Sequence, residues 1–362
     1  MRILIWGNSY PRIGGVETFV ANLASALLDR NIEVAIMSDG PAGHGPNTLG
    51  VPVWTVPMVD PINDADPLGI LQAGRGVRAA FDAFRPDVVH YNASGAEILI
   101  FDRVMHASTV AAVTTLHNVL DGINARSAAR LFERCSAITA VSDYVRSAVL
   151  DKYPPPARGI QVIPNALPGR AAHQAEPAGR SVLALGRMID DKGFDTLVDA
   201  FAIVLRRCPD ARLTIAGDGP ERELLIRRAA HLGIARAVTF SGWIEPDRVH
   251  RAMGEAALIV MPSRWQEPFG LVALEAALAG RPCVATSVGG LPSIVADGDT
   301  GRLVPPGQPE AMATAIVGLL SDPAGAAAMG VRARQRAARD FDFDRMIDAY
   351  VDTFASAHAY EG

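Results

Sequence analysis

Two carboxylates close to one expected helix start carry the first chemical signal in this chain. Glu267 stands beside Pro268 in what must be a loop, and Glu275 follows about two turns inside an expected helix, at roughly 3.6 residues per turn. Glu275 is the only charged residue between Phe269 and Gly280, so we expect this helix to be buried. A buried carboxylate needs a partner or a ligand.

The start of the same helix is expected to bind an anion. N–H groups in the first turn of a helix have no partner inside the helix and lie at the positive end of its dipole. Carboxylates beside a phosphate suit a ligand that also carries hydroxyls, such as a sugar nucleotide. The alternative is structural: a buried glutamate paired with an arginine, and a solvated glutamate in the loop. The amides in question belong to Phe269, Gly270, Leu271 and Val272.

Two cations follow a second expected strand. Residues 181–185 form a buried apolar run, and Gly186-Arg187 and Lys192-Gly193 come directly after it. Ligands of open parallel sheets bind beyond the carboxyl ends of the strands, and glycine allows close approach. Two fixed cations suit a diphosphate, whereas an ordinary basic loop is the alternative.

The first half of the chain has weaker signals of the same kind. Gly14 and Gly15 end the loop 7–15 and offer free N–H groups at a helix start. His117 follows the expected strand 113–116, so it is a polar group at a carboxyl end. Tyr91-Asn92 ends another strand and could line an acceptor site. A plain turn and a structural histidine are the alternatives.

The elements that must position these residues repeat along the chain. Short apolar runs alternate with helical patterns, which predicts an α/β protein with parallel sheets. We expect an N-terminal domain over 1–165, a linker rich in Ala, Pro and Gly over 166–180, a second domain over 181–342, and a last helix near 343–360. The expected strands are 3–6, 34–37, 88–91, 113–116, 137–141, 182–185, 212–216, 238–241, 258–261, 283–286 and 303–304.

Composition limits the function. A chain of 362 residues with 49% hydrophobic residues can build two cores, and a net charge of −5 argues against binding nucleic acid. The three cysteines are far apart in apolar surroundings and lack metal-ligand spacing. No run approaches the roughly 18 apolar residues of a membrane span. We expect a cytoplasmic protein, and peripheral association with the inner face of the membrane stays open.

The second half carries a longer series of motifs. These are Gly186-Arg187, Lys192-Gly193, Gly217-Asp218-Gly219-Pro220, Phe240-Ser241-Gly242, Pro262-Ser263, Glu267-Pro268-Phe269-Gly270-Leu271, Glu275-Ala276, Ala279-Gly280 and Gly289-Gly290. This series resembles the retaining glycosyltransferases of family 4 (glycosyl transferases group 1), which have the GT-B fold of two Rossmann-like domains with parallel sheets facing across a cleft. The first half matches only at residues 14–17 and 164–165, so the resemblance specifies the donor half better than the acceptor half.

The resemblance implies a hexosyltransferase-type enzyme of bacterial glycan, glycolipid or glycosylated-metabolite biosynthesis. It would transfer a sugar from a nucleoside-diphosphate sugar to the hydroxyl of a lipid-linked sugar, a saccharide or a small metabolite, with retention and without a metal or other cofactor. The resemblance implies the catalytic residues Arg187, Lys192, Glu267 and His117. It implies donor-binding roles for Gly14, Gly15, Gly186, Arg187, Lys192, Phe269, Gly270, Leu271, Val272 and Glu275, the last on the ribose.

Other classes of protein remain as alternatives. A GT-B sugar-nucleotide epimerase would share the architecture, and a non-catalytic nucleotide-sugar binding protein would share the site. An NAD-linked oxidoreductase is disfavoured, because the Gly217-x-Gly219 motif has Arg222 where a dinucleotide fingerprint needs its third glycine.

Overall fold

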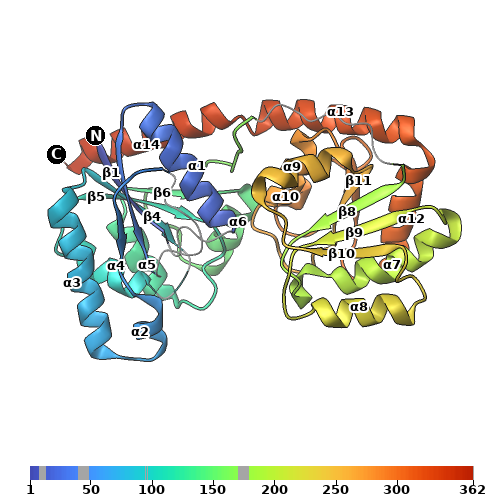
Figure 1. The fold of residues 1–362 in the computed structure, drawn as a ribbon. Coiled ribbons are helices and arrows are strands. Elements are labelled where there is room, and N and C mark those ends of the chain that lie inside the picture. Colours follow the sequence, from blue (N-terminus) through green and yellow to red (C-terminus); the bar gives the residue numbers. More distant parts are fainter. Residues whose placement is uncertain (8–13, 40–48, 94, 96, 170–178, 362) are drawn as a thin grey trace. The chain divides into compact units, whose positions relative to one another are not determined.

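The computed structural model describes residues 1–7, 14–39, 49–93, 95, 97–169 and 179–361. The chain divides into two compact units. Unit 1 comprises Met1–Pro168 together with Phe343–Gly362, and unit 2 comprises Gly169–Asp342. Each unit is built on a parallel sheet covered by helices (Figure 1).

Unit 1 contains a seven-stranded parallel sheet. Its inner strands are buried on both faces, as expected for helix-covered parallel strands, and Ile3 to Trp6 are completely buried. The strand order is β3 (Val53–Thr55), β2 (Glu33–Ser38), β1 (Arg2–Trp6), β4 (Val88–Ala93), β5 (Ala111–Leu116), β6 (Ala137–Ala140) and β7 (Gln161–Val162).

Three helices of unit 1 begin at side-chain caps. Asp66, Asn124 and Ser142 each accept a hydrogen bond from a first-turn amide of α3, α5 and α6. Helix α4 contacts both α3 and α5, so these three form one layer. The helices are α1 (Gly15–Asp29), α2 (Val59–Asn63), α3 (Pro67–Phe84), α4 (Ile98–Met105), α5 (Ala125–Arg134), α6 (Asp143–Lys152) and α14 (Phe343–Glu361).

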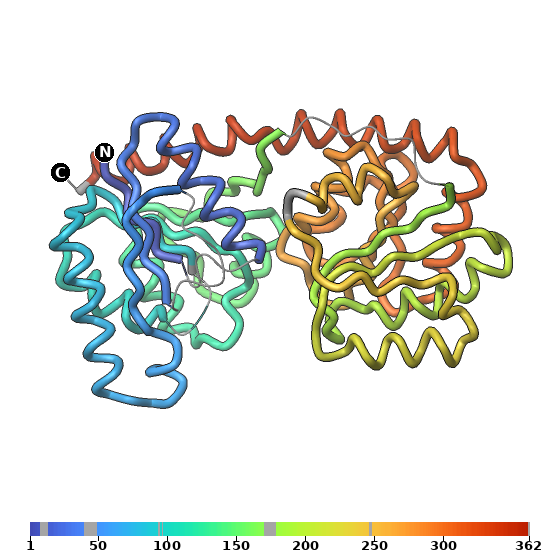
Figure 2. The backbone as a smooth tube through the Cα atoms, in the orientation of Figure 1, coloured from blue at the N-terminus to red at the C-terminus, as the bar shows by residue number. Residues whose placement is uncertain are grey.

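The last helix, α14, packs on the sheet of unit 1. It contacts β5, β4 and α1, and Figure 2 shows it in red beside the blue α1. Its apolar side, with Met346, Ile347, Tyr350 and Phe354, is buried. The amide of Ala166 donates to the sulfur of Met346 at 3.2 Å, so the end of the first chain segment is fixed to this helix.

Unit 2 contains a six-stranded parallel sheet. Its strand order is β10 (Val238–Gly242), β9 (Arg212–Ala216), β8 (Ser181–Leu185), β11 (Leu258–Met261), β12 (Cys283–Thr286) and β13 (Gly301–Val304). Its helices are the short 3₁₀ helix η1 (Asp190–Lys192), α7 (Phe194–Arg207), α8 (Arg222–His231), α9 (Pro246–Glu255), α10 (Leu271–Leu278), α11 (Leu291–Ile294), α12 (Pro309–Ser321) and α13 (Pro323–Asp340).

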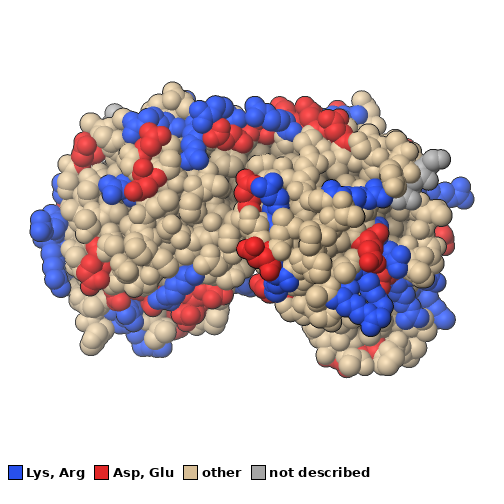
Figure 3. Space-filling model, turned by 180° about the vertical axis from the view of Figure 1, so that it is seen from behind, with Lys and Arg blue, Asp and Glu red and all other residues tan. Residues whose placement is uncertain are grey.

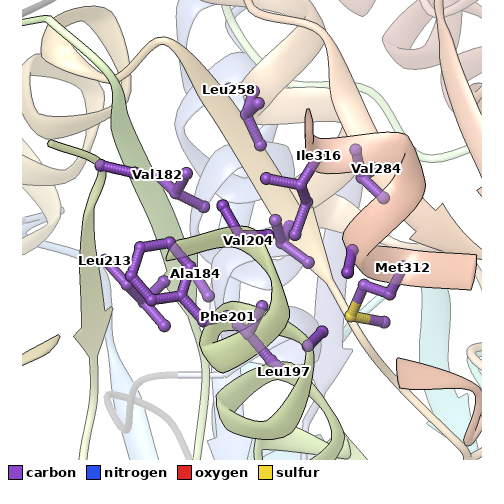
Figure 4. Close-up of a cluster of buried hydrophobic side chains, with 14 of the residues drawn as sticks. Val182, Ala184, Leu197, Phe201, Val204, Leu213, Leu258, Val284, Met312 and Ile316 are labelled. Carbon is purple, nitrogen blue, oxygen red and sulfur yellow. The ribbon is translucent and has the colours of Figure 1, made fainter. Parts of the chain in front are cut away.

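The core of unit 2 lies between its sheet and the helices α7 and α12 (Figure 4). Phe201 of α7 and Ile316 of α12 are fully buried against strand residues such as Val182 and Leu258. Burial of apolar surface at about 25 cal/mol per Å² stabilises this unit and makes its strand ends a rigid support.

The predicted fold class is confirmed: the chain has two α/β units with parallel sheets. Every predicted strand is present within about one or two residues, and only β3 and β7 were not predicted, because runs of three and two residues give no periodic signal.

No single helix of the described residues is long and apolar enough to span a bilayer. Only the pair Pro309–Ser321 and Pro323–Tyr360, taken together, has the necessary length and apolar composition, and this pair is bent by 102°.

Basic and acidic side chains lie beside one another on the face of the molecule drawn in Figure 3. Nineteen ion pairs among the described residues agree with this mixture. Most of them are exposed and stabilise little. One of them, between Lys192 and Glu267, is largely buried and lies at the carboxyl edge of the sheet in unit 2.

Candidate active site

Lys192 and Glu267 form the centre of the candidate site. The Lys192 Nζ atom lies 2.5 Å from Glu267 Oε1, and the two side chains are 24% and 8% exposed. Ser263 Oγ donates to the same oxygen at 2.6 Å. No described residue binds Oε2, so the protein holds this carboxylate through one oxygen.

The loop after β8 presents Lys192. Strand β8 pairs with β11, so the loops after these strands meet at one edge of the sheet. Gly193, directly after Lys192, has φ +64, and a Cβ there would lie 2.2 Å from the carbonyl oxygen of Pro262. Only glycine therefore lets the turn with Lys192 lie against the end of β11.

The loop after β12 supports Glu267 from the other side. The amide of Gly290 donates to the carbonyl of Glu267 at 2.7 Å, and the amide of Gly289 donates to the side chain of Gln266 at 2.8 Å. Thr286 Oγ1 donates to the carbonyl of Ser263 at 2.6 Å. Three neighbouring strand ends thus fix the backbone on both sides of the carboxylate.

The start of α10 offers the predicted free amides. The helix begins at Leu271, preceded by Gly270 with φ +112. The N–H groups of Phe269, Gly270, Leu271 and Val272 donate to no other described residue, and no side chain caps them. Such donors suit an anion.

Arg187 provides a cation that is not engaged. It follows β8 and Gly186, is exposed, and makes no ion pair with any described residue. Lys192 on the same loop is already paired with Glu267. From the sequence both residues were expected to bind phosphate, whereas in the structure Lys192 is paired and Arg187 has no ion-pair partner among the described residues.

The position of Glu275 corrects one expectation. It lies about one turn inside α10 rather than two, because the left-handed Gly270 delays the helix start to Leu271. It is half-buried rather than buried. The buried residues of α10 are Ala273, Leu274, Ala276 and Ala277, so Glu275 lies at the border of the apolar face.

His117 lies in unit 1, just beyond β5. It is 7% exposed, and its Nε2 atom lies 2.9 Å from Asn92 Oδ1, while Asn92 Nδ2 donates to the carbonyl of Trp6 at 3.2 Å. These bonds fix the Asn92 amide so that its oxygen accepts from His117 Nε2–H. Burial lowers the pKa of His117 to about 3, so the ring is neutral at physiological pH.

The predicted glycine loop is described only at its end. Gly14 is the extended N-cap residue of α1, which begins at Gly15, and its carbonyl accepts from the amide of Thr18 at 3.0 Å. Residues 8–13 of this predicted loop lie outside the described residues. Unit 1 therefore holds Gly14, Gly15 and His117, and unit 2 holds all the other predicted site residues.

Two residues of the site had no role assigned from the sequence. Ser263 binds Glu267, and its place in the Pro262-Ser263 motif was the signal for it. Arg264 binds three residues of the Lys192 loop and the start of α7, which no local pattern indicates.

Among the described residues no group of three or more His, Cys, Asp or Glu side chains could hold a metal ion.

Two family models match this chain. "Glycosyltransferase Family 4" matches residues 13–168, and "Glycosyl transferases group 1" matches residues 170–336. The two models adjoin and together account for nearly the whole chain. The chain belongs to glycosyltransferase family 4. This family-4 glycosyltransferase thus has its Lys192–Glu267 pair in the half that matches group 1.

Curated relatives of this family-4 glycosyltransferase are also transferases. It is 29% identical over 400 residues to a glycogen synthase of Mycobacterium tuberculosis, covering 99% of this chain and 95% of the relative. It is 37% identical over 226 residues to a GDP-mannose-dependent alpha-(1-6)-phosphatidylinositol monomannoside mannosyltransferase of Mycolicibacterium smegmatis, covering 57% and 58%.

Solved structures show the same fold. Anabaena HepE in complex with UDP matches with a TM-score of 0.84 at 22% identity, covering 98% of this chain and 100% of that one. Sucrose-phosphate synthase from Thermosynechococcus elongatus matches with a TM-score of 0.83 at 21% identity, covering 99% of both chains. The fold of this family-4 glycosyltransferase is GT-B.

Proposed function

We propose that this glycosyltransferase moves a sugar from a nucleoside-diphosphate sugar to a hydroxyl acceptor, with retention at the anomeric carbon and without a metal. The observation that carries the proposal is the Lys192–Glu267 pair beside the unoccupied amides that begin α10. A cation, free N–H donors and a carboxylate with one free oxygen match a phosphate next to a polyol. The complexes of HepE with UDP and UDP-glucose support a donor of this class.

The proposed chemistry follows from where charge develops. When the nucleoside diphosphate leaves, negative charge grows on its β-phosphate and positive charge on the sugar ring. Arg187, Lys192 and the amides of α10 stabilise the phosphate, which is the role of fixed donors in a site without a metal. Glu267 Oε2 holds a sugar hydroxyl, and Glu275 binds the ribose.

Retention without a covalent enzyme intermediate requires the acceptor to attack from the face that the leaving group departs. In this proposal the departing phosphate oxygen takes the acceptor proton, so no side chain needs to act as a covalent nucleophile. His117 is neutral and therefore contributes a hydrogen bond near the transferred sugar rather than a proton. The acceptor belongs to the classes of lipid-linked sugar, saccharide or small metabolite.

The first experiment identifies the donor. UDP, GDP, ADP and their sugars are compared in a thermal-shift panel, where a ligand at 100 times its dissociation constant stabilises by about 2.7 kcal/mol. We expect one nucleotide to stand out, and its sugar then serves as donor with a set of hydroxyl acceptors. No shift with any nucleotide would contradict the proposal.

The second experiment tests the reaction course. We expect an α-anomeric product from an α-linked donor, read from the anomeric coupling in the NMR spectrum, and unchanged turnover in EDTA. Loss of activity in chelator that Mn²⁺ or Mg²⁺ restores would overturn metal independence. Isomerised donor without any acceptor would indicate an epimerase instead.

A further inference from the structure

Arg264 makes an unusually complete set of contacts beside the candidate site. Its Nη2 atom donates to both carboxylate oxygens of Asp195 at 2.6 Å and to Thr196 Oγ1 at 2.8 Å. Its Nη1 atom donates to the carbonyl and the carboxylate of Asp190 at 3.1 and 3.0 Å. The guanidinium thus binds the residues on both sides of Lys192.

The backbone of residues 264–265 also binds the loop that carries Lys192. The amides of Arg264 and Trp265 both donate to the carbonyl of Asp191, at 2.8 and 3.1 Å. Asp191 directly precedes Lys192, and Trp265 lies two residues before Glu267. Arg264 therefore connects the loop that carries the cation to the loop that carries the carboxylate.

Arg264 differs from Arg187 in that its donors are used in hydrogen bonds to the protein. Five hydrogen bonds to protein oxygens occupy both of its terminal nitrogens, so it has little capacity left for a ligand. Arg187, on the same sheet edge, makes no ion pair with the described residues. One arginine is available to a ligand, and the other is used within the protein.

We propose that Arg264 is a positioning residue of the transfer reaction, which fixes Lys192 relative to Glu267 through Asp190 and Asp195. The inference rests on the proposed function and assigns a role within the same site. Arg264 touches no reacting atom; it acts through Lys192.

The physical basis is the shape of the guanidinium. Its planar, forked donors reach oxygens of three residues at once, which a lysine ammonium on a flexible chain cannot do with the same geometry. Burial by itself would raise the pKa of Asp195, but the hydrogen bond and charge of Arg264, together with the backbone amide of Thr196 and the charge of Arg228, outweigh burial and lower the pKa, so this carboxylate stays charged and bound. Misplacement of a catalytic group by about 1 Å can cost about 10²-fold in rate.

The test compares Arg264 with an arginine that binds the same helix elsewhere. Arg264→Ala removes all of its hydrogen bonds to Asp190, Asp195 and Thr196, and Arg264→Lys keeps the charge without the forked donors. Arg228→Ala is the matched control. Arg228 makes a two-point ion pair with Asp199 of α7 at 2.6 and 2.5 Å, contacts neither site loop, and acts on Asp195 through charge alone, without a hydrogen bond. We expect turnover to fall about 10- to 100-fold in Arg264→Ala and about 10-fold in Arg264→Lys. Arg228→Ala should keep the parental value.

A double-mutant cycle with Lys192→Ala tests whether Arg264 acts through Lys192. In the Lys192→Ala background we expect Arg264→Ala to cost less than about 3-fold, because the group that Arg264 positions is gone. Full additivity of the two losses would overturn the inference, since it would show a general structural effect. Parental turnover in Arg264→Ala would overturn it as well.

Hydrogen exchange separates this inference from the proposed function. Without any substrate, we expect Arg264→Ala to speed amide exchange in 189–193 and 262–267, and Arg228→Ala to leave both segments unchanged. Faster exchange in a protein that transfers no sugar from any donor would refute the proposed function while keeping the connection between the loops. Unchanged exchange would refute the connection itself.

Discussion

At the scale of single residues, Lys192 has two tasks that a single and a double variant together separate. It neutralises a carboxylate that is 8% exposed, and we propose that it stabilises the departing phosphate. Lys192→Ala should lower turnover by about 10²–10³, or roughly 3–4 kcal/mol in activation free energy. It should also lower the free energy of unfolding by about 1–3 kcal/mol, because Glu267 loses its partner.

Two further variants check this prediction. Lys192→Ala with Glu267→Gln should recover part of the stability and none of the turnover, as measured by steady-state kinetics and thermal unfolding. Lys152→Ala is the control, since Lys152 pairs with Asp121 at 2.6 Å on an exposed surface of unit 1. Parental turnover in Lys192→Ala would remove the phosphate role.

The two glutamates should separate into a nucleotide contact and a sugar contact. Glu275→Gln should weaken binding of the bare nucleoside diphosphate about 10-fold, because a charged partner of a hydroxyl contributes roughly 1.5–3 kcal/mol. Glu267→Gln should leave that affinity within about 3-fold and lower transfer. Isothermal titration calorimetry with the bare nucleotide measures both affinities. If Glu267→Gln lost nucleotide affinity and Glu275→Gln kept it, the two roles would be exchanged.

At the scale of elements, the start of α10 depends on Gly270. Its φ is +112, and a Cβ there would lie 2.5 Å from Leu291 Cδ2. Gly270→Ala should destabilise unit 2 by about 1–3 kcal/mol and weaken nucleotide binding, because the strained backbone displaces the free amides. Gly307→Ala is the control: its φ is +69, but a Cβ meets nothing within 4 Å. Equal nucleotide affinity in both variants would show that the α10 amides do not bind the phosphate.

At the scale of the whole molecule, the two units should respond differently to mild acid. Burial lowers the pKa of His90 and of His117 from 6.5 to about 3, with the neighbouring His117 as a second cause for His90. Both rings are neutral in folded unit 1, whereas the unfolded chain binds protons below about pH 6.5. The stability of unit 1 is therefore full above pH 6.5 and falls as the pH drops toward 3.

The expected slope for two protons is at most about 2.7 kcal/mol per pH unit. Among the described residues of unit 2 no histidine is buried, and the lowered carboxyl pKa values of Asp195 and Asp340 matter only at lower pH. Calorimetry at pH 7.5 and 5.5 should move the unfolding transition of unit 1 and leave that of unit 2 nearly unchanged. Equal shifts of both transitions would contradict the assignment.

The amino-acid pattern by itself determined the elements and the family. Buried parallel strands appear as short apolar runs, and the glycines and charges that follow them mark the carboxyl ends where ligands of such sheets bind. From this, the loop after β8, the loop after β11 and the histidine after β5 could all be placed in advance. These features are local, so a local pattern is sufficient to predict them.

Only the tertiary structure decided which of these residues meet. Lys192 and Glu267 are 75 residues apart in sequence and 2.5 Å apart in space, since β8 and β11 are neighbours and Gly193 allows their loops to touch. The same register brings Arg264 to Asp195, across 69 residues. Such contacts depend on strand order and on close fit between segments that are distant in sequence. The residues adjacent to Lys192, Glu267 or Arg264 in the sequence determine neither.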